Sequence, residues 1–369
     1  MVANALLLAP LLLIAGAARA IPSSGCRHSV LPPGQRHSLP ANKTVMRNLN
    51  MTDKHGLKAN RRYAVHVPSS YDRENPQPLP LLLYVHGQSG TAKGDIPPYT
   101  AIGEREGFIT VSGQGLGADQ ACSSGWNVGP TNGTCTREAW SPFGANATCC
   151  YDTCRQLGSC SDAGQGEEHH CAWSTCFDDV AFLELLLATI EAELCVDTAA
   201  RFVTGGSNGG MMTHYLAAQL PSTFAAVLPI YGLPLQGMLS VPQHLANVSI
   251  LQFHDRWDTT IPIAGGKSGQ GWFYTSLNAT LQAWVAVAGG DPHRPPVRLP
   301  TQWDGGGQRM ECFEYLPTGM EEAPVAATRR RRVIKCLFDG YHGSWLPENH
   351  GEEMTWWFMK QHLHTVVTE

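Results

Sequence analysis

The stretch RFVTGGSNGGMMTHYLAAQL, residues 201–220, decides how the rest of the chain is interpreted. Its first residues are β-branched or apolar, four glycines then surround Ser207 and Asn208, and an amphipathic run follows. This order predicts a strand, a tight turn and a helix. Residues 205–209 fit the pattern G-x-S-x-G, in which a serine hydroxyl stands on a strained strand-to-helix turn. The alternative is an ordinary glycine turn with a capping serine.

A serine on such a turn becomes a nucleophile only when a histidine accepts its proton and a carboxylate orients that histidine. The segment LQFHDRWDTTIP ends a predicted strand and offers Asp255 and Asp258, and FDGYHGSWLP ends the last predicted strand and offers His342. The carboxyl ends of parallel strands lie at one edge of a sheet, where such sheets place their sites. We therefore predict that Ser207, an aspartate and His342 meet there, in the chain order typical of this kind of site.

The negative oxygen formed during attack on a carbonyl needs two amide donors. The backbone amide of Asn208 follows the serine and is the first candidate donor. The segment YVHGQSG, residues 84–90, closes a buried strand, and the amide of Gln88 is the natural second donor, with Ser89 as the alternative. Losing one such donor typically costs about 3 kcal/mol of transition-state stabilisation. An ordinary strand-to-loop glycine is the other interpretation of the His-Gly pair in this segment.

Apolar runs alternate with helical spacing along the chain, which predicts an α/β fold with a mostly parallel sheet and helices on both faces. Strands are expected at 61–68, 79–87, 107–113, 201–205, 224–232, 248–255, 310–317 and 332–340, and helices at 178–194, 272–290 and 351–364. Asp178 and Asp179 begin the first of these helices, where the helix dipole favours acids. We expect this pair to have no chemical role.

The first twenty residues are expected to be removed. An apolar run over 5–18 ends in Ala-Arg-Ala, which predicts a signal peptide cut after Ala20, although no Lys or Arg precedes the run. An uncleaved anchor is the alternative, but the run is shorter than the roughly 20 residues of a membrane span. We therefore predict a secreted, extracellular protein without a membrane partner. Residues 21–60 are predicted to form a polar N-terminal arm, and residues 61–369 the catalytic domain.

Cysteine usage agrees with an oxidising compartment. The chain has twelve cysteines, an even number, which suggests up to six disulfides. Eight of them lie in an insertion at about 114–176 that has little apolar periodicity. The pair His169-His170 beside Cys171 suggests zinc less strongly than disulfides, so we expect no metal and no other cofactor. Six sequons predict glycosylation at Asn42, Asn50, Asn132, Asn146, Asn247 and Asn278.

The charge pattern excludes a large basic surface. The net charge is −5 and only 15% of residues are charged, so we expect no nucleic-acid partner. The one basic run, Arg329 to Arg332, is predicted to be a solvated hairpin tip. A site for a processing protease is the alternative.

Over residues 61–363 the chain resembles the secreted esterases of the poly(3-hydroxybutyrate) depolymerase and feruloyl esterase group, which have the α/β-hydrolase fold. The group's motifs lHG, DDVgFl, GlSnGGmM, HGtaDxxVP and GgGHtWP correspond here to YVHGQSG, FDDVAFL, GGSNGGMM, HDRWDTTIP and GYHGSWLP. The resemblance selects Asp258 as the acid, because Asp255 stands where the group has glycine.

The resemblance also implies two substrate-contacting tryptophans. Trp126-Asn127 is similar to a WN element that borders the active-site cleft of the group. Trp345 matches the tryptophan of the histidine motif, although two residues separate it from His342 where the group has one. Cys149-Cys150 resembles the paired cysteines before the group's first long helix. The extra cysteines are expected to staple an insertion over the cleft or a short decoration without a role in catalysis.

The expected activity is hydrolysis of a carboxylic ester through an acyl-enzyme. The substrate would be a small-molecule or polysaccharide-linked ester, either a feruloyl or acetyl ester of a plant-type polysaccharide or a hydroxyalkanoate-type ester. We expect no Ser/Thr-rich linker or separate substrate-binding domain after the last predicted helix, which favours the plant-type esters or soluble oligoesters. A serine peptidase of the same fold and an inactive binding protein of this fold are the alternatives.

Overall fold

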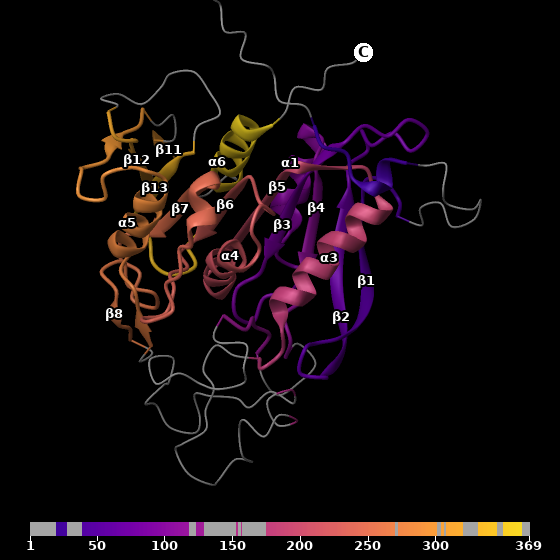
Figure 1. Ribbon diagram of the computed structural model, residues 1–369, viewed down its shortest axis with the longest axis horizontal. Helices are drawn as coiled ribbons and strands as arrows, with labels where there is room; N and C mark the ends of the chain where they lie inside the picture. Colours follow the sequence, from indigo (N-terminus) through magenta and orange to yellow (C-terminus); the bar gives the residue numbers. More distant parts are fainter. Residues whose placement is uncertain are drawn as a thin grey trace, which may run out of the picture.

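The computed structural model describes residues 20–27, 39–117, 123–128, 153, 156, 175–269, 272–300, 304–305, 308–319, 331–344 and 350–363. Its main feature is an eleven-stranded sheet with the strand order β1-β2-β4-β3-β5-β6-β7-β13-β12-β10, in which β11 pairs with β12. Figure 1 shows this sheet running across the width of the molecule.

The main sheet consists of β1 (Lys43–Thr52), β2 (Lys58–Val67), β3 (Leu79–Val85), β4 (Ile109–Gly113), β5 (Val196–Gly206), β6 (Ala226–Ile230), β7 (Ser249–Asp255), β10 (Val297–Arg298), β11 (Asp304–Gly305), β12 (Gln308–Tyr315) and β13 (Val333–Phe338). A separate two-stranded sheet joins β8 (Gly266–Lys267) and β9 (Phe273–Tyr274).

The centre of the main sheet is parallel. Strands β4, β3, β5, β6, β7 and β13 run in one direction, whereas the strands outside them pair antiparallel. The central strands are apolar and buried along most of their length, as expected of strands covered on both faces. Their carboxyl ends therefore meet at one edge of the sheet.

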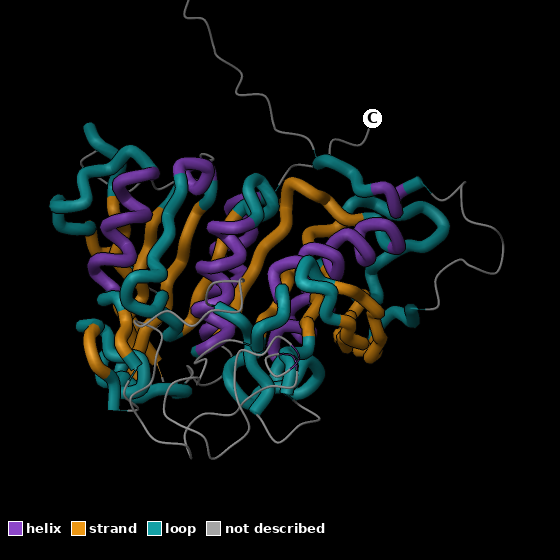
Figure 2. Tube along the Cα trace, turned by 60° about the horizontal axis from the view of Figure 1, so that its bottom comes forward, coloured by secondary structure: helices purple, strands orange, loops and turns teal. Residues whose placement is uncertain are grey.

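Helices cover both faces of the sheet, as Figures 1 and 2 show. The α-helices are α1 (Pro97–Glu106), α3 (Asp179–Glu193), α4 (Asn208–Gln219), α5 (Leu277–Val287) and α6 (His350–Met359), and the 3₁₀ helices are η1 (Ser24–Cys26), η4 (Gln243–Asn247) and η6 (Lys360–His362). Side chains of α3, α4 and α5 belong to one core cluster and those of α1 and α6 to another. The predicted α/β class is therefore confirmed.

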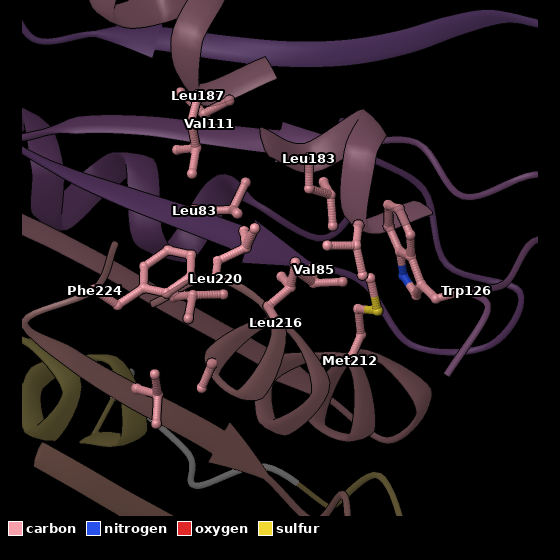
Figure 3. Close-up of a cluster of buried hydrophobic side chains, with 14 of the residues drawn as sticks. Leu83, Val85, Val111, Trp126, Leu183, Leu187, Met212, Leu216, Leu220 and Phe224 are labelled. Atoms are coloured by element: carbon pink, nitrogen blue, oxygen red, sulfur yellow. The ribbon is translucent and has the colours of Figure 1, made fainter. Parts of the chain in front are cut away.

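The larger core cluster lies between the sheet and helices α3 and α4. Figure 3 shows Leu83 and Val85 of β3 facing Leu183 of α3 and Leu216 of α4. Leu83, Val85, Leu183 and Leu216 are fully buried. This packing stabilises α3 and α4, the helix that begins at the serine turn, since burying one such side chain contributes about 1.5–3 kcal/mol.

The prediction of a polar arm over residues 21–60 is wrong. Residues 43–52 form β1, which pairs with β2 along its whole length at the edge of the sheet. Every second side chain from Val45 to Met51 is partly covered, and the residues between them are mostly exposed. An edge strand that is covered on one face alone tolerates many polar residues, and this explains the misleading composition.

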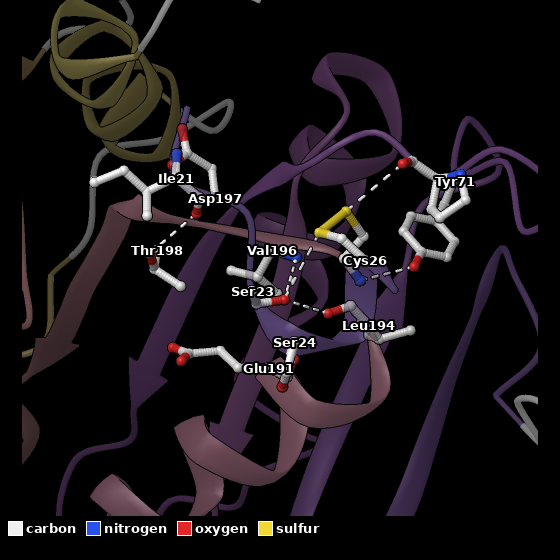
Figure 4. Close-up of a disulfide and its surroundings, with 12 residues drawn as sticks. Ile21, Ser23, Ser24, Cys26, Tyr71, Glu191, Leu194, Val196, Asp197 and Thr198 are labelled. Carbon is white, nitrogen blue, oxygen red and sulfur yellow. Dashed lines mark hydrogen bonds between the residues drawn. A yellow bond between two sulfur atoms is a disulfide. The ribbon is translucent and has the colours of Figure 1, made fainter. Parts of the chain in front are cut away.

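Residues 21–26 are also fixed in place. Ser23 Oγ donates to the carbonyl of Leu194 at 2.8 Å and accepts from the amide of Val196 at 3.0 Å. Cys26 forms a disulfide with Cys195, so the segment is bonded to the start of β5 (Figure 4). A segment with these contacts is part of the folded domain.

The described cysteines support the disulfide prediction. Cys312 and Cys336 are bonded across β12 and β13, opposite each other in the sheet. Cys176 is also disulfide-bonded, with a partner outside the described residues. Most of the predicted insertion at 114–176 lies outside the described residues. Cys149-Cys150 and His169-His170 belong to this part.

Other predictions can be compared with the described elements. The helix expected at 272–290 begins later, at Leu277, because residues 273–274 form β9 and Ser276 caps the helix by accepting from the amide of Ala279. Arg332 is not part of a solvated tip, since it forms an ion pair with Glu314 at 2.6 Å. In the described part of the chain, no helix has the length and hydropathy of a membrane span.

Candidate active site

Ser207 stands at the turn between β5 and α4. Its backbone has φ 55° and ψ −121°, in the left-handed region that a residue with a Cβ rarely adopts. The glycines around it are required by close packing, because a Cβ at Gly205 would lie 2.2 Å from the carbonyl oxygen of Val85, and one at Gly209 only 1.9 Å from the same atom. The strand before the serine and the helix after it therefore both press against β3.

The structure brings the three residues of the predicted triad together. His342 Nε2 lies 2.9 Å from Ser207 Oγ, and His342 Nδ1 lies 2.7 Å from Asp258 Oδ2. The residues come from the ends of three strands, β5, β7 and β13, whose carboxyl ends share one edge of the sheet. Ser207 and His342 are partly exposed, so a substrate can reach them.

The surroundings of Asp258 determine which nitrogen of His342 carries the proton. Asp258 Oδ1 accepts from the backbone amides of Thr260 and Ile261, both at 2.8 Å, and its side chain is fully buried. A carboxylate held by these donors accepts a further hydrogen bond from His342 Nδ1. The neutral ring then has its lone pair on Nε2, where it can accept the proton of Ser207 Oγ.

A second histidine, His254, lies close to Asp258. His254 is fully buried, and its Nε2 donates to the carbonyl of Ile261 at 2.9 Å while lying 3.7 Å from Asp258 Oδ2. Burial lowers the pKa of His254 to about 4, so the ring is neutral at neutral pH. It therefore supports the loop that holds Asp258 without adding a charge.

The backbone after β3 lies beside the serine. A Cβ at Gly87 would lie 3.2 Å from the carbonyl oxygen of Gly206 and 3.4 Å from Ser207 Cβ, so this loop packs closely against the serine turn. The amide of Ser89, one of the two candidate donors, is already bonded to the carbonyl of Ser124 at 2.8 Å. The geometry therefore favours the other candidate, the amide of Gln88. The amide of Asn208 begins α4, at the positive end of the helix dipole.

His86 holds the loop that carries Gln88. Its Nδ1 donates to the carbonyl of Gly87 at 2.7 Å, and its Nε2 accepts from the amide of Gly115 at 2.9 Å. Burial lowers the pKa of His86, so the ring keeps this neutral arrangement. The loop is thus fixed to the end of β4 through one side chain.

The resemblance implied that Trp126 borders the active-site cleft. The structure does not place it on a cleft wall. The side chain is only 1% exposed, its Nε1 donates to the carbonyl of His86 at 2.8 Å, and its amide donates to Asn208 Oδ1 at 2.8 Å. Figure 3 shows it at the end of the core cluster, beside Met212. Trp126 therefore supports the two loops around the serine. Trp345 lies outside the described residues.

A tyrosine near the triad has features that the sequence did not reveal. Tyr231 has a positive φ of 34°, and its ring lies 5.1 Å from that of His342. A Cβ at Gly206 would meet the Tyr231 hydroxyl at 3.0 Å, so this ring covers the turn before the serine. Strained residues often accompany functional sites, but a tyrosine after a strand carries no signal for such strain.

Asp255, the rejected candidate for the triad acid, has a different environment from Asp258. It is fully buried, neither carboxyl oxygen has a hydrogen-bond partner, and a Cβ at Gly340 would lie 2.6 Å from its Oδ1. Burial and the nearby charge of Asp258 raise its pKa to about 8. Asp255 is therefore protonated at neutral pH, which suits neither a charged partner for the histidine nor a metal ligand.

The other predicted sites are partly described. Among the sequon asparagines, Asn42, Asn50, Asn247 and Asn278 are exposed, as a glycan requires, whereas Asn132 and Asn146 lie outside the described residues. The described residues contain no group of three or more side chains arranged to hold a metal ion.

Comparison with curated proteins links the chain to esterases. It is 36% identical over 148 residues to a probable feruloyl esterase C of Aspergillus clavatus, a match that covers 40% of this chain and 52% of the relative. The chain thus spans about half the length of that relative. It is 28% identical over 333 residues to feruloyl esterase D of Neurospora crassa, covering 81% of this chain and 90% of the relative. No protein-family model matches the chain.

Among solved structures, the acetyl xylan esterase of Aspergillus awamori superposes with a TM-score of 0.52 at 16% identity, over 85% of this chain and 98% of the other. The chain has the α/β-hydrolase fold. The serine turn, the parallel strands and the loops after β7 and β13 correspond to the expectations drawn from the sequence.

Proposed function

We propose that this α/β-hydrolase is a serine carboxylic ester hydrolase with Ser207, His342 and Asp258 as its catalytic triad. The observation that carries the proposal is the pair of hydrogen bonds at 2.9 Å and 2.7 Å that links the three side chains. Each bond has the length needed for proton transfer or for orienting the base. The names of the relatives favour ester hydrolysis over other reactions of a serine nucleophile.

The mechanism is a two-step acyl transfer. Ser207 Oγ attacks the ester carbonyl while His342 Nε2 takes the hydroxyl proton, and Asp258 stabilises the resulting imidazolium. The amides of Gln88 and Asn208 donate to the oxyanion. His342 then gives its proton to the departing alcohol, and water releases the acid from the acyl-enzyme by the same steps in reverse. No metal or organic cofactor takes part.

The proposed substrates are feruloyl or acetyl esters of plant-type polysaccharides. Support comes from the relatives named feruloyl esterase, and hydroxyalkanoate-type esters are the second candidate class. We further propose that the protein is extracellular. The predicted signal peptide and the described disulfides, Cys26–Cys195 and Cys312–Cys336, support this location.

The test is hydrolysis of p-nitrophenyl acetate by the purified protein and by its Ser207→Ala variant. We expect the wild-type protein to release p-nitrophenol with a burst and the variant to show only the background rate. Equal rates would exclude Ser207 as the nucleophile. A panel of methyl ferulate, acetylated xylan and hydroxybutyrate oligomers then identifies the preferred ester.

Two alternatives predict different outcomes of the same assays. A serine peptidase of this fold would cleave p-nitroanilide peptides at rates comparable to or above those for the esters. An inactive binding protein would release no p-nitrophenol above background, although Ser207, Asp258 and His342 are all present. Reaction with a fluorophosphonate probe, lost in Ser207→Ala, separates an active serine from an inert one whatever the substrate.

A further inference from the structure

Two aromatic side chains next to the triad are exposed to solvent. Trp257 is 52% exposed and Tyr341 is 67% exposed, and their ring centroids lie 6.3 Å apart with the ring planes inclined by 43°. We call these two residues the aromatic pair. Within the described part of the chain, every other exposed large hydrophobic side chain is aliphatic. Exposed apolar side chains that lie together can mark a ligand-binding site.

The aromatic pair is placed by the same loops that carry the triad. Trp257 directly precedes Asp258, and Tyr341 directly precedes His342. The amide of Trp257 donates to the carbonyl of Gly340 at 3.2 Å, which joins the two loops.

The loops are held firmly enough to present the rings in a defined arrangement. Ser344 donates its amide to the carbonyl of Tyr341 at 2.8 Å, and its Oγ accepts from the amide of Tyr341 at 3.1 Å. Arg256 forms ion pairs with Glu311 at 2.5 Å and with Asp339 at 3.0 Å. These two ion pairs hold the residue that precedes Trp257 in place.

The proposed reaction determines which half of the ester lies near these loops. The carbonyl oxygen must face the amides of Gln88 and Asn208. The alcohol oxygen must face His342 Nε2, because that nitrogen returns the proton to the leaving group. The alcohol half of the substrate therefore leaves along the side of the site formed by the loops of Asp258 and His342.

We propose that the aromatic pair, Trp257 and Tyr341, binds the sugar ring that carries the ester, and so selects polysaccharide-linked esters over simple alkyl esters. This inference rests on the proposed function. A sugar ring has one face of C–H groups that packs on an aromatic ring, and two inclined rings cover more of it than one. A methyl ester has no group that reaches the aromatic pair.

The test compares two substrates with the same acyl group, methyl ferulate and a feruloylated arabinoxylan oligosaccharide. We expect Trp257→Ala and Tyr341→Ala each to lower the ratio of kcat/KM for the sugar ester to that for the methyl ester about tenfold, through KM. Trp257→Phe should restore part of the ratio. Leu185→Ala is the matched control, since Leu185 is a 39% exposed hydrophobic residue on α3.

Two outcomes would overturn the inference. The first is an equal loss of kcat/KM on both feruloyl substrates in Trp257→Ala and Tyr341→Ala, with no loss on p-nitrophenyl acetate. This result would mean that the aromatic pair binds the feruloyl ring. An unchanged ratio would show that the aromatic pair does not contact the substrate. Both outcomes leave the proposed function intact, because wild-type ester hydrolysis is measured in the same assay.

A binding measurement tests the aromatic pair without catalysis. Calorimetry of the Ser207→Ala variant with unesterified arabinoxylan oligosaccharide should show binding that is weakened about tenfold by the added Trp257→Ala change and unaffected by Leu185→Ala. Failure of this binding, with active wild-type enzyme, contradicts the inference. Binding by a protein that hydrolyses no ester would support the aromatic pair and overturn the proposed function.

Discussion

The two ends of β5 differ in how the chain is held. At its start, Val196 accepts from and donates to Ser23, and the neighbouring Cys195 is bonded to Cys26. At its end, Ser207 has a positive φ, and among the described residues its side chain bonds only to His342. The half of the strand before Ser207 is paired on both sides, with β3 over residues 201–205 and with β6 over residues 202–206. Strain at the functional end persists because the rest of the strand is fixed by its surroundings.

The largest expected effect is on catalysis by Ser207, at the carboxyl end of β5. Ser207→Ala should lower kcat for ester hydrolysis about a million-fold, because the nucleophile is removed. Its unfolding free energy should stay within about 0.5 kcal/mol of wild type, since the backbone strain remains. Steady-state kinetics and denaturant unfolding measure the two quantities. A large change in stability would contradict the separation of the two ends.

The next effect concerns the orienting carboxylate. Asp258→Asn should lower kcat about ten-thousand-fold, because an amide does not stabilise the charged form of His342 and favours the wrong tautomer. Asp255→Asn, three residues away, is the matched control and should keep most of the activity. Similar losses in both variants would contradict the assignment of Asp258 as the acid.

Removing the disulfide at the start of β5 should lower the stability of the protein and leave its activity unchanged. The double change Cys26→Ser and Cys195→Ser removes a crosslink between residues 169 positions apart. We expect the unfolding free energy to fall by about 4 kcal/mol, because the unfolded chain gains conformational freedom. kcat on p-nitrophenyl acetate at 25 °C should be unchanged. A fall in kcat of the folded variant would show that the two ends of β5 are coupled.

A smaller effect depends on pH. The pKa of Asp255 is about 8 in the folded protein, against about 3.9 in an unfolded chain. The folded state therefore holds a proton that the unfolded state releases, and this contribution to stability is lost as pH rises from about 4 to about 8. The side chain that Asp255→Asn introduces does not titrate. The Tm of the variant minus the Tm of wild type should therefore become more positive as pH rises from 5 to 8.5. A pH-independent difference in Tm would be inconsistent with a raised pKa.

The smallest effect measures the strain itself. Ser207→Gly should raise the unfolding free energy by about 1 kcal/mol, because glycine adopts a positive φ without steric cost. The comparison is with Ser207→Ala, which also lacks the hydroxyl but keeps the Cβ. If both variants unfold at the same denaturant concentration, the turn stores no measurable strain.

The sequence predicted the centre of the fold better than its edges. Buried parallel strands such as β3 and β7 are continuous apolar runs, and the glycines around Ser207 have a specific spacing, so both features could be recognised. The edge strand β1 was missed because its polar residues hid the alternation of Val45, Leu49 and Met51. Strands covered on one face carry a weaker hydrophobic signal.

The site was predicted in part for similar reasons. The order of Ser207, Asp258 and His342 follows from strand ends that the sequence shows. The burial of Trp126 and of Asp255 depends on contacts with distant segments, such as His86 and Gly340, which no local pattern encodes. The sequence favoured Gln88 over Ser89 as a donor, and the bond between Ser89 and Ser124 adds a reason that no local pattern shows.

The bonds around residues 21–26 have a consequence for maturation. The Ile21 backbone nitrogen lies 2.9 Å from Asp197 Oδ1, and Asp197 is buried (Figure 4). Cleavage after Ala20, as the sequence predicts, would turn this nitrogen into an α-ammonium group, which is largely charged at neutral pH. Removal of the leader would then convert an amide-to-carboxylate hydrogen bond into an ion pair, which would strengthen the attachment of the new N-terminus to β5.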